Sequence, residues 1–264
     1  MISPELFDTH CHLDFPLLSE QLPALLGRAA AAGIGGFLVP GVAPDGWPGI
    51  AALAEHHEAV FPAFGLHPLL ADRCTDQILA ELACLAVKAT AIGEIGLDYT
   101  VREPERELQR VAFREQLRLA VTAGKPVLIH CRSAFQDLLR ILREERVKHV
   151  GGVMHAFSGS PEIARECIRL DLFISIAGTV TYRNAVRPLG LVRQIPLTHM
   201  VLETDAPDMT PEPFRGIANE PAFLLETARR VAELKGVALA TVAETTCRNA
   251  YTMLRIPPRG DTNE

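Results

Sequence analysis

Short apolar runs alternate with longer amphipathic stretches along almost the whole chain. Eight runs, rich in apolar and β-branched residues, have the length of buried strands and span residues 6–10, 36–40, 60–66, 89–95, 126–130, 151–155, 172–177 and 199–204. The stretches between them place apolar residues at helical spacing, most clearly over 105–124, where Gly124 marks the end of the helix. The alternation predicts repeated βα units around a parallel sheet.

Eight such units favour a closed barrel over an open sheet. We therefore expect the α/β class and a single-domain (β/α)₈ TIM barrel over residues 1–256, followed by a disordered tail over 257–264. Two further helices are predicted over 221–235 and 238–254, the second packed outside the barrel.

Composition narrows the class of protein. With 48% hydrophobic and 22% charged residues among 264, the chain can bury a large core. Neither a signal peptide nor a run of ~20 apolar residues is present, so we expect a cytoplasmic protein without membrane contact. The six cysteines form no Cys-x-x-Cys pair and are expected to be reduced. A net charge of −6 argues against extended coating of a polyanion, but not against a small site for phosphate.

Side chains able to bind metal recur where predicted strands end, which in a barrel is the face that carries active sites. They are His10, His12, Glu94, His130, His155 and Asp205. Each alone has an ordinary explanation, a buried histidine or a turn-forming aspartate. Their shared position indicates a metal site.

Two of these motifs carry additional local information. In Asp8-Thr9-His10-Cys11-His12, the alternation of a strand sends His10 and His12 to the same side, so two imidazoles can hold one ion. Glu94 lies in an apolar strand, where a carboxylate is costly unless it is paired or bound to metal.

Seven motifs in order along the chain resemble the TatD-type metal-dependent hydrolases of the amidohydrolase superfamily. They lie at residues 8–14, 65–68, 93–98, 130–134, 155–159, 203–207 and 219–221. Residues 203–209, with 178–182 before them, look most like the YjjV-type branch.

The resemblance implies a binuclear centre with two divalent cations per chain. One ion would take His10, His12, Glu94 and Asp205, and the other would take Glu94, His130 and His155. Glu94 would bridge the two ions, where many relatives in the superfamily use a carboxylated lysine. Imidazole and carboxylate ligands suit Zn²⁺, Mn²⁺ or iron, and Mg²⁺ fits an oxygen-rich position, so the ligand types leave the metal open.

Paired cations would activate a water and stabilise charge on a phosphodiester. Asp205, with Glu94 beside it, is the candidate catalytic carboxylate and general base. His67 is assigned to binding of the substrate phosphate, with a structural role as the alternative. Arg132 is a candidate to clamp phosphate, with pairing at the surface as the alternative. Further candidates in the loops are Arg183 and Arg215 for phosphate, and Tyr99, Phe157, Tyr182 and Phe214 for base stacking. Residues 219–221 fit a helix N-terminus.

The resemblance implies a 3′–5′ exonuclease acting on single-stranded DNA, so DNA or another phosphoester is the expected partner, and we expect a monomer. The same site would also suit an aminoacyl-tRNA ester, a lactone or a small phosphoester, and the alternatives stay open. A metal-binding protein without turnover would be expected to lack a ligand, whereas every position is filled.

Overall fold

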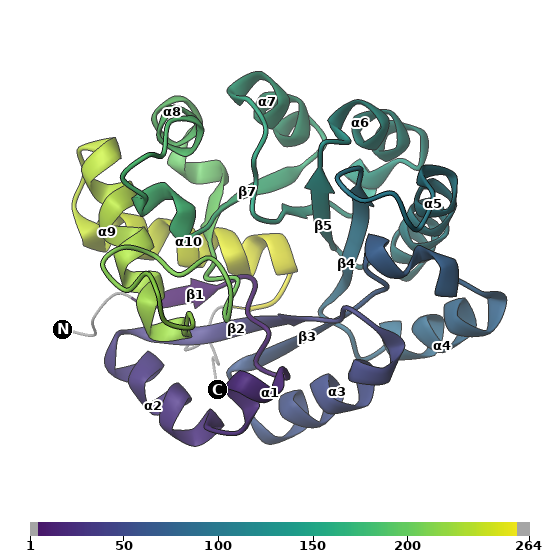
Figure 1. Ribbon diagram of the computed structural model, residues 1–264, viewed down its shortest axis with the longest axis horizontal. Coiled ribbons are helices and arrows are strands. Elements are labelled where there is room, and N and C mark those ends of the chain that lie inside the picture. The colour runs from purple at the N-terminus through teal and green to yellow at the C-terminus, as the bar shows by residue number, and fades with distance from the viewer. Residues whose placement is uncertain (1–4, 258–264) are drawn as a thin grey trace.

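Eight parallel strands, paired in chain order, close into a barrel with helices around it (Figure 1). The computed structural model describes residues 5–257. Closure comes from β8, which pairs with β7 over three residues and with β1 at Asp8↔Leu202. The predicted single-domain (β/α)₈ barrel is confirmed.

The described residues contain the following elements. The strands are β1 (Leu6–Asp8), β2 (Ile34–Pro40), β3 (Val60–Phe64), β4 (Ala91–Asp98), β5 (Val127–Arg132), β6 (Gly152–Met154), β7 (Leu172–Ile176) and β8 (Met200–Leu202). The α-helices are α1 (Pro16–Ser19), α2 (Leu22–Ala31), α3 (Trp47–His56), α4 (Asp76–Ala86), α5 (Arg106–Ala123), α6 (Phe135–Glu144), α7 (Pro161–Arg169), α8 (Arg187–Gln194), α9 (Leu224–Lys235) and α10 (Leu239–Leu254). Short 3₁₀ turns are η1 (Pro44–Gly46), η2 (Pro68–Arg73), η3 (Val147–His149), η4 (Gly178–Thr181), η5 (Leu197–His199) and η6 (Pro221–Phe223).

All eight predicted strands exist, but the ends of several differ from the prediction. β1 and β8 end before His10 and Asp205, because the chain there leaves the strand ladder, although the Asp205 N–H still donates to the His10 carbonyl. β4 and β5 instead remain paired beyond Glu94 and His130, as far as Asp98↔Arg132. Glu94 and His130 therefore lie within strands and do not close them.

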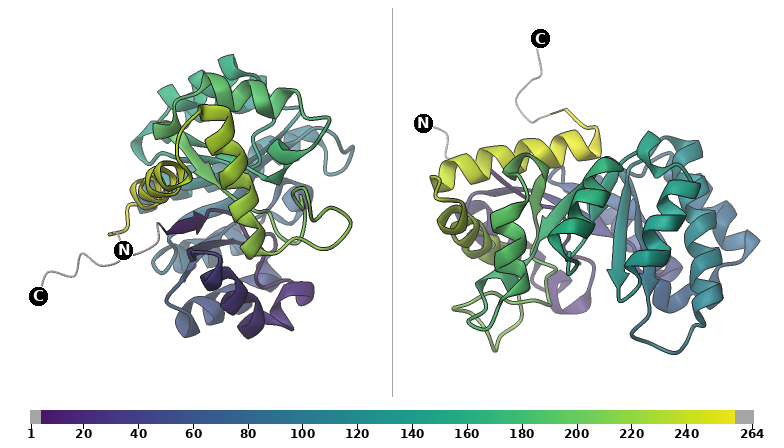
Figure 2. Two further views of the ribbon diagram at one scale, coloured as in Figure 1. Left: turned by 90° about the vertical axis from the view of Figure 1, so that its left-hand side faces the viewer. Right: turned by 90° about the horizontal axis from the view of Figure 1, so that it is seen from above.

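Besides the large core between the strands and the outer helices, a smaller core fills the barrel interior and extends to α10. Buried residues from seven strands belong to it, among them Phe7 and Val201, and the β7 residue Phe173 packs against it. Side chains from all eight strands can meet only inside the barrel. Figure 2 shows α10 lying across the end of the barrel opposite the long loops. The last predicted helix is present as α10, and it packs outside the strands across the N-terminal opening of the barrel.

The outer helices end largely where the sequence predicts. α5 closes at Gly124 and α9 at Gly236, and both glycines adopt φ of 66°, the left-handed conformation typical of helix ends. Within residues 5–257, none of the helices has the length and apolar character to cross a bilayer. The predicted disordered tail, 257–264, lies outside the described residues except for Pro257.

Candidate metal centre

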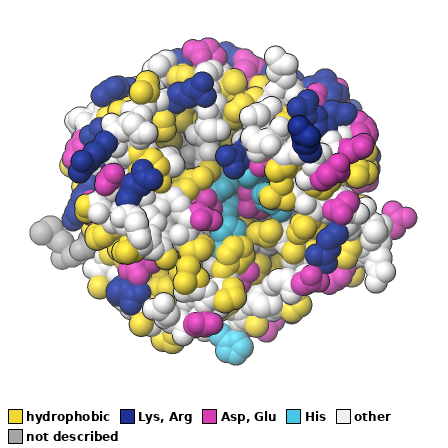
Figure 3. Space-filling view, viewed as in Figure 1, with side chains coloured by type: hydrophobic (Ala, Val, Ile, Leu, Met, Phe, Trp, Pro, Cys, Tyr) yellow, Lys and Arg dark blue, Asp and Glu magenta, His cyan; other side chains and the backbone are white. Residues whose placement is uncertain are grey.

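A pocket of about 820 Å³ opens at the C-terminal ends of the strands. The space-filling view in Figure 3 shows a hollow in this face with histidine and acidic side chains at its floor and hydrophobic side chains around it. The pocket lining includes five of the six predicted ligands, His12, Glu94, His130, His155 and Asp205, and His10 lies buried just below them.

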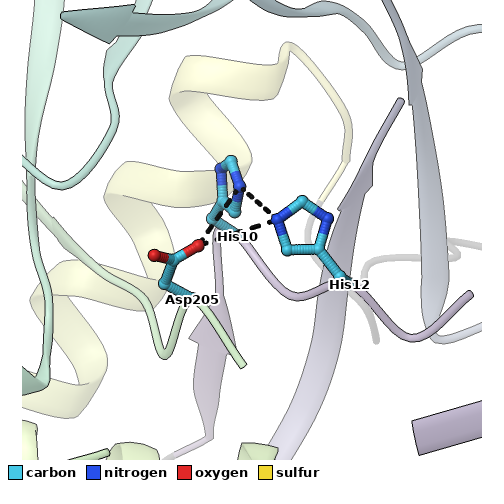
Figure 4. Close-up of side chains that lie close together, drawn as sticks. All are labelled: His10, His12 and Asp205. Carbon is cyan, nitrogen blue, oxygen red and sulfur yellow. Dashed lines mark hydrogen bonds and ion pairs between the residues drawn. The ribbon is translucent and has the colours of Figure 1, made fainter. Parts of the chain in front are cut away.

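His10, His12 and Asp205 form the first group of converging atoms (Figure 4). The Nε2 atoms of His10 and His12 lie 3.2 Å apart, and Asp205 Oδ1 lies 3.6 Å and 3.7 Å from them. Glu94 Oε2 lies 3.4 Å from His10 Nε2. Ligands about 2.1 Å from one ion lie roughly 3 to 3.5 Å apart, so these four atoms have the spacing of a common ligand set.

The second group forms around the other oxygen of Glu94. Glu94 Oε1 lies 2.9 Å from His130 Nδ1 and 3.7 Å from His155 Nε2. Glu94 therefore places one oxygen in each group, as a bridging carboxylate would. The two ligand sets inferred from the resemblance are spatially possible.

A bulge in β4 directs Glu94 toward the pocket. Between Ile92 and Ile95, β4 has one residue more than β5, and the Glu94 N–H donates to the Gly41 carbonyl. Two residues on, Gly96 adopts φ of +149°, and a Cβ there would lie 2.0 Å from the His130 carbonyl oxygen. Only glycine fits this approach of the two strands.

Two carboxylates behind the site orient its histidines. His130 Nε2 lies 3.1 Å from Asp98 Oδ2, and His155 Nδ1 lies 3.1 Å from Glu203 Oε2. If each imidazole donates its proton to its carboxylate, the other ring nitrogen is free to bind a metal, an arrangement typical of metal-bound histidine. Glu203 therefore supports His155 from behind and does not itself face the pocket. Both carboxylates were missed in the sequence.

The hydrogen bonding of His67 separates it from the ligands. His67 Nε2 lies 3.6 Å from Glu94 Oε1, close enough to be grouped with Glu94 and His130. Its Nδ1, however, accepts the Leu69 N–H at 3.2 Å. A neutral imidazole then carries its proton on Nε2, which makes His67 a hydrogen-bond donor facing the pocket and not a ligand.

The electrostatics of the cluster favour anionic carboxylates and added positive charge. Burial by itself raises the pKa of Glu94, but the surrounding imidazoles of His67, His10 and His155 outweigh burial and hold that pKa well below its ordinary value. Burial lowers the pKa of His155, yet the carboxylates of Glu203, Asp205 and Glu94 raise it to about 10. Burial and the charge of His155 lower the pKa of His10, which leaves that imidazole neutral, as a ligand must be.

The predicted substrate residues divide by location. Arg132 is exposed at the end of β5 and lines the pocket, whereas neither Arg183 nor Arg215 does. Arg215 instead lies over the Tyr182 ring, 4.1 Å from its centroid. Of the predicted stacking residues, Phe157 alone lines the pocket.

The other predicted aromatics contact neighbouring side chains. Tyr99 donates to Asp137 at 2.6 Å, and Phe214 stacks on Phe223 with ring centroids 4.0 Å apart. Phe15, which the sequence did not indicate, lines the pocket and stacks on His12.

Three buried amides hold the loops and strand ends of the site. Gln109 and Gln116, one heptad apart on α5, bond the backbone of Asp98 and of Leu66. Asn219 donates to the carbonyls of Thr204 and Asp208, on either side of Asp205. Pro221 begins a helical turn, as predicted, but the Asn219 side chain does not cap that turn. Asn219 instead anchors the loop that carries Asp205.

Comparison with known proteins extends over nearly the whole chain. The model of the family described as TatD related DNase matches residues 7–255. The uncharacterized metal-dependent hydrolase YabD of Bacillus subtilis (strain 168) is 38% identical over 253 residues, covering 95% of this chain and 99% of YabD. The uncharacterized metal-dependent hydrolase YjjV of Escherichia coli (strain K12) is 35% identical over 254 residues, 95% of this chain and 98% of YjjV.

Solved structures agree with the sequence relatives. The crystal structure of YjjV from E. coli K12 superposes with a TM-score of 0.91 at 35% identity, covering 97% of this chain and all of that one. A TatD family hydrolase from Entamoeba histolytica superposes with a TM-score of 0.87, covering 96% of this chain and 99% of that one, and at 20% identity it supports the fold alone.

Proposed function

The chain belongs to the TatD-related DNase family of metal-dependent hydrolases, and from this membership we propose that it cleaves phosphodiester bonds as a 3′–5′ exonuclease on single-stranded DNA. The reaction would use two divalent cations, with His10, His12, Glu94, His130, His155 and Asp205 as their ligands.

The observation that carries the proposal is the negative charge at the pocket floor and directly behind it. Four buried carboxylates lie 2.9–3.8 Å from imidazole nitrogens, namely Glu94, Asp98, Glu203 and Asp205. With neutral imidazoles, their combined charge matches two divalent cations. Such a site, open to substrate on one side only, is suited to hydrolysis of a negatively charged ester.

The chemistry supplied by the bound cations would be a lowered pKa of a shared water and stabilisation of charge on the phosphodiester. The protein's own groups hold the reacting atoms. Asp205 contacts His10, His12 and His155 through Oδ1, and its second oxygen points away from His10 and His12 in Figure 4, which leaves it free to accept the proton of water. The His67 Nε2–H and the Arg132 guanidinium would hold phosphate oxygens.

The shape of the pocket favours a strand end over a long duplex. The reactive groups lie at the floor of a concave pocket, and the net charge of the chain is −6. A protein with a net negative charge gains little from many phosphate contacts, so recognition must concentrate at the pocket.

The test is hydrolysis of a 5′-labelled single-stranded DNA oligonucleotide with added Mg²⁺ or Mn²⁺. We expect stepwise shortening from the 3′ end, and loss of at least ~1000-fold in rate in Glu94→Ala and Asp205→Ala. The control is Glu58→Gln, because Glu58 is exposed and precedes β3 on the opposite face.

An intact oligonucleotide, together with cleavage of an aminoacyl ester, a lactone or a small phosphoester by the same protein, would retain the hydrolase and refute the nuclease. Activity that survives both substitutions would refute the site. A cytoplasmic location and a monomeric state stay predictions.

A further inference from the structure

A second groove continues from the metal pocket over the rim of the barrel. It has a volume of about 410 Å³ and lies between the loop after β6 and helix α8. Ser158, Gly159 and Arg187 line both the groove and the metal pocket, so the two form one continuous path.

The groove wall is mainly apolar, and Phe135 is the aromatic residue that lines it. Phe157 lines the metal pocket and Phe135 lines the groove, and their ring centroids lie 5.5 Å apart. A Cβ on Gly159 would lie 2.6 Å from Phe157 and 3.0 Å from Phe135. Glycine at this position lets both rings approach the backbone and leaves the path open.

Arg187 stands at the junction of the two spaces without a partner. It is exposed, and within residues 5–257 it has neither an ion pair nor a hydrogen bond from its guanidinium. On the neighbouring helices, by contrast, Arg143, Arg165 and Arg169 all pair with glutamates.

Helix stability does not account for this arginine. Arg187 is the first residue of α8, where the positive end of the helix dipole disfavours a cation, whereas Arg193 lies in the last turn of the same helix, where a cation is favourable. An unpaired guanidinium in a groove that Phe135 also lines suits a ligand that combines a flat ring with one negative charge.

We propose that this groove binds the nucleotide next to the one being removed, with Arg187 on its phosphate and Phe135 against its base. The inference rests on the proposed nuclease function and adds to it a specificity-determining residue. A nucleotide has the required combination of aromatic base and single charge, and bases of any kind stack on aromatic side chains. A second nucleotide would then be needed for tight binding.

The test compares Arg187→Ala with the matched control Arg193→Ala. With a single-stranded oligothymidylate, we expect about a tenfold rise in KM for Arg187→Ala and an unchanged kcat. With bis(p-nitrophenyl) phosphate, which has no second nucleotide, the rise in KM for Arg187→Ala should be at most about twofold. Arg187→Lys, which keeps the charge, should recover most of the loss.

Two readouts separate a phosphate contact from a structural role. The slope of log KM against log salt should fall by about 0.7 in Arg187→Ala, the value for one phosphate on a single strand. Fluorescence anisotropy should show about tenfold weaker binding of an oligothymidylate with phosphorothioate linkages, whether or not the wild type cleaves DNA. Equal binding by wild type and Arg187→Ala, or an equal loss on both substrates, would overturn the proposal. Weaker binding without any DNA cleavage would retain the groove and refute the nuclease.

Discussion

Replacing Glu203 with glutamine should weaken metal binding, although Glu203 is not itself a candidate ligand. Glu203 is fully buried, and its two oxygens lie 3.1 Å from His155 Nδ1 and 2.7 Å from the Ala156 N–H. The two donors bond different oxygens of Glu203, and glutamine keeps an acceptor at only one of these positions and places an NH2 donor at the other. The other donor remains buried and unsatisfied, at a cost of about 1–3 kcal/mol.

The expected loss of affinity follows from this geometry. Removing the carboxylate behind a metal-bound histidine typically weakens metal binding by about 10- to 100-fold, which equals roughly 1.4–2.8 kcal/mol and agrees with the cost of the lost hydrogen bond. The ion held by Glu94, His130 and His155 should be the one affected. The ion at His10 and His12 should bind with nearly unchanged affinity.

Isothermal titration calorimetry of Mn²⁺ or Zn²⁺ into the metal-free protein measures both affinities. Asp8→Asn is the matched control, because Asp8 is equally buried but bonds only Thr204 and the His10 backbone. We expect a few-fold change at most in that control. Affinities of Glu203→Gln within twofold of the wild type at both positions would refute the role given to Glu203.

Three further substitutions test other parts of the structure. Burial raises the pKa of Asp8 from 3.8 to about 7, so between these pH values the folded state holds a proton that the unfolded state has lost, and the free energy of unfolding falls as pH rises, by up to about 1.4 kcal/mol per pH unit. In urea unfolding, the stability of Asp8→Asn relative to the wild type should therefore rise from pH 5 to pH 7. A stability difference that does not change with pH would contradict this. Phe7→Ala leaves a cavity in the core beneath α10 and should lower the free energy of unfolding by about 3–5 kcal/mol while metal affinity is retained. A loss below about 1 kcal/mol would contradict the close packing of Phe7 against α10. Gly96→Ala forces a Cβ against the His130 backbone, so thermal unfolding should show lower stability and metal titration the loss of one ion. Gly27→Ala, in open space on α2, should be neutral or stabilising in the same measurements. Equal effects of the two substitutions would contradict the close approach at Gly96.

The barrel and the candidate ligands could be predicted because they depend on local pattern. Apolar runs of strand length mark the eight strands, His10 and Asp205 follow closely on the ends of β1 and β8, and Glu94 lies within β4. Barrel closure then brings together side chains that are far apart in the sequence, without any further information from the residues between them.

The supports of the site could not be predicted in the same way, because they depend on which residues closure places in contact. Glu203 meets a histidine 48 residues earlier in the chain, and its signal, a carboxylate in a buried strand end, was the same signal that marked Glu94. Tyr99 and Phe214 read as loop aromatics, but each has a partner that only the folded structure supplies. The position of α10 also depends on the barrel end that it covers.

The most direct test of a binuclear centre is anomalous diffraction from crystals grown with Mn²⁺ or Zn²⁺. We expect two anomalous peaks, one among His10, His12 and Asp205 and one between His130 and His155, each within bonding distance of a different oxygen of Glu94. A single peak, or two peaks of which one does not contact Glu94, would contradict this expectation.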